Sequence, residues 1–186
     1  PREAFLRPPP WLVHGEPGAE WTSDPTRLYD DALVALDRDR GVNTGSPALH
    51  AAWIAALRPE PGERVVHIGA GTGYYTALLA RLVGPSGRVT AIEVDRDLAA
   101  FAARVLPEVL PDGPPVVVVA DDGETWPRSE ADVVYVSFGI AAPSPLWLDR
   151  LAIGGRLLFP LCLPRHAVSP HRAWHGAEGF GLLVTR

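Results

Sequence analysis

The sequence predicts an α/β fold whose core is a doubly wound, mostly parallel sheet. Two observations lead to this prediction. From Ser46 onward, short apolar runs that are typical of buried strands alternate with longer helical patterns, and parallel strands connected through helices produce such an alternation. In addition, the first strand-like run breaks into three glycines at alternate positions, as expected where a strand turns sharply into a helix beside a bound ligand.

The elements follow one another in the order that this fold requires. Residues 1–45 are expected to form an irregular segment that packs on the core, because PPPW, GEPG and SDP interrupt it and only residues 28–36 have the apolar spacing of a short element. Residues 46–186 are expected to form one domain, which starts with a helix over 46–57 that has Ser46 as its N-cap and Pro47 at its first position. Strands are then expected over 64–70, 88–94, 114–120, 131–138, 155–161 and 180–186, and helices over 74–83, 97–106 and 145–151.

Composition excludes several classes of function. The formal net charge of −5 over 186 residues does not suggest a surface for a phosphate backbone, so nucleic acid is not expected as a partner. A single cysteine, Cys162, rules out an internal disulfide and a multi-cysteine zinc site, and His166, His171 and His175 lack metal-site spacing. No apolar stretch approaches the ~18 residues that span a bilayer, and the first residues lack the pattern of a signal peptide. The sequence therefore predicts a cytoplasmic protein with no metal site and no membrane partner.

The stretch VVHIGAGTGYYTALLARL, residues 65–82, is the most informative part of the chain. Gly69, Gly71 and Gly73 would let the backbone turn tightly and would let a ligand approach it, because no Cβ intervenes. The helix that follows offers free N–H groups to polar atoms of such a ligand. The alternative is that these glycines only allow a strand and a helix to pack closely.

Two acidic positions follow the next two predicted strands. Glu93 lies about 20 residues past the glycines, where an acidic side chain meets a ribose hydroxyl in dinucleotide folds. Asp122, which we prefer over Asp121, stands where a carboxylate or the nearby backbone could receive the exocyclic amine of an adenine. The alternatives are a solvated acid at Glu93, an Asp-Asp-Gly turn at Asp122 and a helix cap at Asp95.

The spacing of the glycines distinguishes between nucleotide cofactors. The nicotinamide fingerprint is G-x-G-x-x-G, whereas here the third glycine comes one residue early and Tyr74 stands at the later position. In HIGAGTGYYTALLARL, AIEVDRDLA and ADDG, the chain resembles the class I S-adenosylmethionine-dependent methyltransferases, and more narrowly the protein-L-isoaspartate O-methyltransferase family. The resemblance covers most of the chain. It implies a Rossmann-like methyltransferase fold, S-adenosyl-L-methionine as cofactor, and O-methylation of a carboxylate in protein repair.

The resemblance also implies which residues form the cofactor site. The glycines make room for the methionine part and the ribose, Glu93 holds the ribose hydroxyls, and Asp122 lies beside the adenine. His67 could orient the glycine turn or the amino acid end of the cofactor, and the alternative is a buried histidine with satisfied hydrogen bonds. The predicted cofactor site consists of His67, Gly69, Ala70, Gly71, Gly73, Tyr74, Glu93, Val94, Asp122 and Gly123.

The predicted acceptor site lies in NTGSPALHA, where the family carries a Thr-Ile-Ser. The resemblance implies that Thr44 and Ser46 are the catalytic residues that position the accepting carboxylate, and Gly45 replaces the isoleucine of the family. A carboxylate is already a nucleophile at neutral pH, so the enzyme needs to align it with the methyl group and exclude water rather than to supply a strong base. The expected partner is therefore a peptide or small molecule that carries a carboxylate.

Other functions stay open at this point. An O-methyltransferase of a small molecule or a biosynthetic peptide is the main alternative. A nicotinamide-linked reductase would need a hydride-site set such as a tyrosine beside a lysine, and the chain contains no lysine. A non-catalytic nucleotide-binding module would be expected to have a degraded glycine turn, whereas all three glycines and Glu93 are present.

Overall fold

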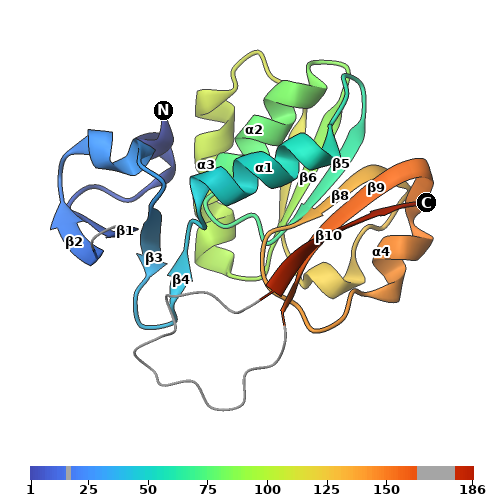
Figure 1. The fold of residues 1–186 in the computed structure, drawn as a ribbon. Coiled ribbons are helices and arrows are strands. Elements are labelled where there is room, and N and C mark those ends of the chain that lie inside the picture. Colours follow the sequence, from blue (N-terminus) through green and yellow to red (C-terminus); the bar gives the residue numbers. More distant parts are fainter. Residues whose placement is uncertain (16–17, 163–178) are drawn as a thin grey trace.

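Six strands form the central sheet of the computed structural model, which describes residues 1–15, 18–162 and 179–186 (Figure 1). Their order is β10-β9-β8-β5-β6-β7, and all neighbours are parallel except the β9–β10 pair. The chain therefore extends the sheet from β5 in both directions, first through β6 and β7 and then through β8 and β9. The strands are β5 Arg64–Ile68, β6 Arg88–Glu93, β7 Val116–Ala120, β8 Ala131–Val136, β9 Leu151–Cys162 and β10 Gly179–Thr185.

Helices cover both faces of this sheet, which confirms the predicted doubly wound α/β fold. Alternate residues of each strand face opposite sides, so that Val65 packs with α1 and α2 on one face while Val66 packs with α4 on the other. Helix α3 lies on the same face as α2 and packs against β7. The helices are α1 Pro47–Leu57, α2 Tyr74–Val83, α3 Arg96–Val109 and α4 Pro145–Asp149.

The helix starts follow from their capping residues. Ser46 accepts a hydrogen bond from the Leu49 N–H at the start of α1, as the sequence predicts. Asp95 accepts bonds from two N–H groups in the first turn of α3, which confirms the alternative that it is a helix cap. Within the described residues, no helix has the length and apolar character that a membrane span requires.

The N-terminal segment differs from the irregular structure expected for residues 1–45. It forms a four-stranded antiparallel sheet in the order β2-β1-β3-β4, beside the α/β core (Figure 1). Prolines and glycines interrupt such short strands, so the alternating pattern that marks a strand never extends far enough to be recognised. The elements are η1 Arg2–Phe5, β1 Trp11–Gly15, β2 Gly18–Thr22, η2 Pro25–Tyr29, β3 Leu33–Asp37 and β4 Val42–Asn43.

Strand β9 begins four residues before its predicted start. The sequence predicts that the strand starts at Gly155, after Gly154, but in the structure both glycines lie inside the strand. Ala131 of β8 pairs with Leu151 of β9, but Val133 pairs with Arg156, so the register shifts and β9 carries extra residues between these two pairs. Glycines inside a strand commonly mark such a bulge, which explains the error in the predicted boundary.

Candidate active site

The glycine turn has a backbone that only glycine adopts readily. The φ angles of Gly69, Gly71 and Gly73 are +81°, +56° and +95°, all in the left-handed region. A Cβ added at Gly69 would lie 2.5 Å from the ring of Phe138, whereas a Cβ at Gly71 would meet nothing closer than a Leu36 methyl group at 3.8 Å. The space above Gly71 is therefore open, as a ligand that approaches the backbone requires.

Glu93, at the end of β6, holds the glycine turn in place. One carboxylate oxygen accepts a hydrogen bond from the Gly71 N–H at 2.7 Å, and the other accepts one from the Asp95 N–H at 3.0 Å. Glu93 is only 8% exposed, so the alternative of a solvated acid is wrong. Each oxygen keeps a further lone pair, which could accept from a ribose hydroxyl. The apolar side chain of Val94, next along the chain, is 74% exposed beside this carboxylate.

Asp122 and Gly123 lie at the end of β7, the neighbour of β6 in the sheet. Asp122 accepts a hydrogen bond from the Glu124 N–H at 3.0 Å and caps the short helix η3 (Gly123–Thr125), so it forms the kind of turn that the sequence left as an alternative. A side chain at Gly123 would overlap that of Ile68 in β5. Both residues thus have structural roles at the sheet edge where Glu93 also lies.

His67 lies beneath the glycine turn and is completely buried. Its ring nitrogens pair with the Thr76 hydroxyl at 2.8 Å and the Ser137 hydroxyl at 3.1 Å. Burial, with a smaller effect of His50, lowers the pKa of His67 to about 3, so the ring is neutral. The Ser137 hydroxyl in turn donates to the Gly69 carbonyl. His67 therefore supports the turn from below and does not line a pocket there.

A pocket of about 340 Å³, which we call the turn pocket, lies between the glycine turn and residues 41–45. Of the predicted site residues, it brings together Thr44, Gly69, Ala70, Gly71 and Tyr74. The other predicted residues lie outside its lining. Further residues that line it and were not predicted include Leu36, Asn43, His50, Thr72, Tyr75, Ser137 and Phe138.

Thr44 and Ser46 differ in their relation to the turn pocket. Thr44 lines it. Ser46 does not, and its hydroxyl has two structural partners: it donates to an Asp31 carboxylate oxygen at 2.7 Å and accepts from the Leu49 N–H at 3.2 Å. The structure thus places Ser46 in the cap of α1, and of these two predicted hydroxyl residues only Thr44 lines the pocket.

Behind Thr44 lies a buried cation, Arg2, which sequence reasoning missed. Its side chain is 2% exposed, and within the described residues its guanidinium has no carboxylate partner. It donates to the Leu28 carbonyl, to the Ala32 carbonyl at 3.3 Å and to the Thr44 hydroxyl at 3.0 Å, while its Nε has no acceptor. Burying a charge without a direct ion pair is costly, although Asp31 lies close enough for the charge of Arg2 to contribute to the lowered pKa of its carboxyl. An anion bound in the turn pocket would offset part of this cost.

The hydrogen bonds of Thr44 leave its proton engaged only in a long bond. Its oxygen accepts from Arg2 and also from the Val34 N–H, each at 3.0 Å. Because both lone pairs are then occupied, the hydroxyl can only donate. The acceptor recorded for it is the Gly45 carbonyl at 3.3 Å, a long bond. Thr44 is therefore a donor, polarised by a buried cation, at the wall of the pocket.

His50 on α1 is the second residue that sequence reasoning missed. It is 5% exposed, stacks on the Tyr75 ring at 3.7 Å and pairs through Nδ1 with the Tyr135 hydroxyl. Burial, with a smaller effect of Arg2, lowers the pKa of His50 to about 4. A side chain at Gly45 would overlap its Nε2. The glycine that replaces the family's isoleucine is thus matched to the position of this imidazole.

One signal in the sequence could have identified His50, and none could have identified Arg2. His50, Ile54 and Leu57 have the spacing of one helix face, and all three are buried. Nothing in the sequence near Arg2 places it beside Thr44, because the two are 42 residues apart. Among the described residues, no cluster of His, Cys, Asp and Glu could hold a metal ion. The three C-terminal histidines lie outside the described residues.

Comparison with known proteins gives a consistent family assignment. The family model of protein-L-isoaspartate(D-aspartate) O-methyltransferase matches residues 19–169. The protein-L-isoaspartate O-methyltransferase of Aeropyrum pernix is 37% identical over 138 residues, which are 73% of this chain and 52% of that protein. The enzyme of the same name from Methanopyrus kandleri is 34% identical over 140 residues, which are 74% of this chain and 62% of that protein. The chain thus spans roughly half to three-fifths of the length of these relatives.

Solved structures show the same likeness. A protein-L-isoaspartate O-methyltransferase superposes with a TM-score of 0.71 and 28% identity, over 87% of this chain and 47% of that one. An S-adenosylmethionine-dependent methyltransferase from Geobacter sulfurreducens, in complex with S-adenosyl-L-homocysteine, superposes with a TM-score of 0.52 and 26% identity, over 62% of this chain and 48% of that one.

Proposed function

The chain belongs to the protein-L-isoaspartate(D-aspartate) O-methyltransferase family, and on this basis we propose that it transfers the methyl group of S-adenosyl-L-methionine to a carboxylate of a peptide. Isoaspartate is the proposed acceptor residue, and repair of damaged proteins the proposed role. The observation that carries the carboxylate assignment is the buried guanidinium of Arg2 behind the Thr44 hydroxyl, which forms no ion pair within the described residues.

The residues at the sheet edge fit the cofactor. Gly71 leaves open space beside its backbone. Glu93, at the end of the next strand, accepts two backbone hydrogen bonds that fix the turn, and each of its oxygens keeps a lone pair for the ribose hydroxyls. The exposed Val94 offers an apolar surface next to Glu93, on which an adenine could rest. The related methyltransferase from Geobacter sulfurreducens binds S-adenosyl-L-homocysteine, the product that remains after methyl transfer. When bound, the cofactor supplies a methyl group activated on a sulfonium.

The proposed role of this chain's residues is to orient and desolvate the acceptor. Thr44 donates to one carboxylate oxygen, and the buried charge of Arg2 favours the ionised form in the pocket. The other oxygen stays free to attack, with no general base required. The aromatic side chains of Phe138 and Tyr74 line the pocket and restrict the access of water. Arg2 acts only through Thr44 and is a positioning residue.

A labelling experiment tests this function. The protein is incubated with methyl-labelled S-adenosylmethionine and two peptides that differ only in carrying isoaspartate or aspartate. We expect label on the isoaspartyl peptide, and we expect mild base to release it as methanol because methyl esters are base-labile. Label that survives base would refute transfer to a carboxylate. Base-labile label on a small carboxylic acid, and on neither peptide, would favour the small-molecule alternative.

A further inference from the structure

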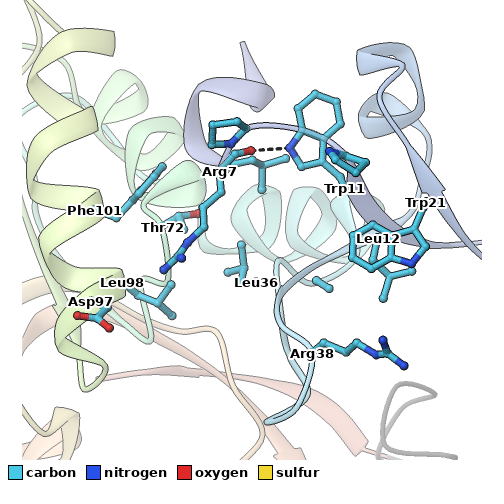
Figure 2. Close-up of a pocket in the computed structure, with 14 residues that line it drawn as sticks. Arg7, Trp11, Leu12, Trp21, Leu36, Arg38, Thr72, Asp97, Leu98 and Phe101 are labelled. Atoms are coloured by element: carbon cyan, nitrogen blue, oxygen red, sulfur yellow. Dashed lines mark hydrogen bonds between the residues drawn. The ribbon is translucent and has the colours of Figure 1, made fainter.

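A second pocket, of about 330 Å³, lies between the N-terminal sheet and α3 (Figure 2). It shares Leu36 and Thr72 with the turn pocket, so the two adjoin across these side chains. Its walls come from both parts of the molecule. They include Leu12, Trp11 and Trp21 from the N-terminal sheet and Leu98 and Phe101 from α3.

Two tryptophan side chains in the wall of this pocket can contact a ligand. Trp11 is fixed by a hydrogen bond from its Nε1 to the Arg7 carbonyl at 2.7 Å (Figure 2). Trp21 is 62% exposed and lines the same pocket, so its ring is open to contact by a ligand there. Such side chains can bury an apolar part of a ligand at a low cost in conformational entropy.

Two cations, Arg7 and Arg38, line this pocket together with one carboxylate, that of Asp97. Arg40, close by in sequence, is engaged by Asp37 and Asp95, both at 2.6 Å. In contrast, neither Arg7 nor Arg38 forms an ion pair within the described residues. Figure 2 shows the Arg7 side chain extending along the pocket toward Leu98. These two guanidinium groups are therefore available to a ligand carboxylate, in a chain whose net charge is negative.

We propose that this second pocket binds the residues that flank the methylated one in an extended peptide acceptor, with preference for an acidic side chain placed against Arg7. This proposal rests on the proposed function. The carboxylate to be methylated lies in the turn pocket, and the peptide continues past Leu36 and Thr72 into the second pocket. An acceptor of this size is a peptide, which separates this reading from that of a small-molecule methyltransferase.

Binding of fluorescent isoaspartyl peptides, followed by anisotropy, tests the proposal without the need for methyl transfer. Three peptides are identical except for one residue next but one to the isoaspartate, which is Glu, Gln or Lys. We expect the Glu peptide to bind about three- to fivefold more tightly than the Gln peptide, and the Lys peptide to bind most weakly.

Variants assign this preference to Arg7. Arg7→Gln should abolish the difference between the Glu and Gln peptides, and Arg7→Glu should invert the order in favour of Lys. Arg88→Gln is the matched control, because this variant removes the same charge as Arg7→Gln. Arg88 lies at the start of β6, at the opposite end of that strand from Glu93. Trp21→Ala should weaken all three peptides alike.

The outcomes separate the two proposals. Equal binding of the three peptides, or a preference that Arg7→Glu leaves unchanged, would overturn the assignment of the second pocket. Peptide binding with the expected order but without methyl transfer from S-adenosylmethionine would instead refute the proposed function and leave the pocket assigned.

Discussion

At the scale of single residues, Glu93 supports both the fold and the cofactor site. Glu93→Ala removes the acceptor of two backbone N–H groups, at Gly71 and Asp95. We expect S-adenosylmethionine to bind more weakly by about 1.5–3 kcal/mol, and the free energy of unfolding to fall by about 1–3 kcal/mol. Calorimetric titration and urea unfolding measure the two effects. Glu93→Gln, which keeps one acceptor oxygen, should restore part of both, and unchanged affinity in Glu93→Ala would remove this residue from the site.

Thr44 and Ser46 offer a matched pair of hydroxyl deletions. Ser46→Ala should cost about 1 kcal/mol of stability, because it removes the N-cap of α1, while KM for the acceptor stays the same. Thr44→Val keeps the shape of the side chain but leaves Arg2 and the Val34 N–H without an acceptor. It should raise KM for the acceptor, and Thr44→Ser should restore it. A Ser46→Ala enzyme with reduced turnover and normal stability would show instead that Ser46 contacts the acceptor.

The two buried histidines make stability depend on pH. Burial lowers the pKa of His50 to about 4 and that of His67 to about 3, below the ordinary value of 6.5 that the unfolded chain keeps. Between these values the unfolded chain binds more protons than the folded one, so stability falls as the pH falls. The stabilisation is complete above about pH 6.5 and is lost progressively down to about pH 4 for His50. Urea unfolding at pH 7.5 and pH 5.0 measures the difference, which His67→Gln should reduce.

At the scale of elements, the loop between β4 and α1 is matched to the face of α1 that it covers. Gly45 has a φ of +71°, and any side chain there would overlap the His50 ring. Gly45→Ile, which introduces the residue of the family pattern, should therefore lower the free energy of unfolding by more than about 2 kcal/mol. In the Gly45→Ile/His50→Ala double variant, the steric part of this cost should disappear. Additive losses in the double-mutant cycle would contradict a direct clash.

The elements also show what can be read from a sequence and what cannot. Helix α2 begins and ends where the sequence predicts, because glycines bound it at both ends. The position of Glu93 could be predicted for a related reason, because one helix and one strand fix its distance along the chain from the glycine turn. The spacing of His50 predicts only that it faces the core, and its partner Tyr135 is 85 residues away. Arg2 could not be predicted, because it reaches the site through Thr44, which is 42 residues away. Local patterns give no information about such contacts.

At the scale of the whole molecule, the N-terminal segment packs on the α/β core through η1. Phe5 is 2% exposed and packs with Ala102 and Leu106 of α3, and its ring meets that of Tyr74 edge to face at 5.6 Å. Phe5→Ala should destabilise the protein by about 3–5 kcal/mol. Because Arg2 belongs to the same short helix, acceptor binding should weaken more than cofactor binding. Urea unfolding and separate titrations of the two ligands measure this, and an equal loss for both would contradict it.

The position of Arg2 has a consequence for how the protein responds to its ligand. The same guanidinium fastens the N-terminal segment, through the Leu28 and Ala32 carbonyls, and polarises the hydroxyl at the pocket wall. Docking of this segment and capture of an anion are therefore thermodynamically coupled, and such coupling is reciprocal. A bound carboxylate should slow amide hydrogen exchange throughout η1, although η1 does not line the turn pocket, and loosening the segment should release the carboxylate.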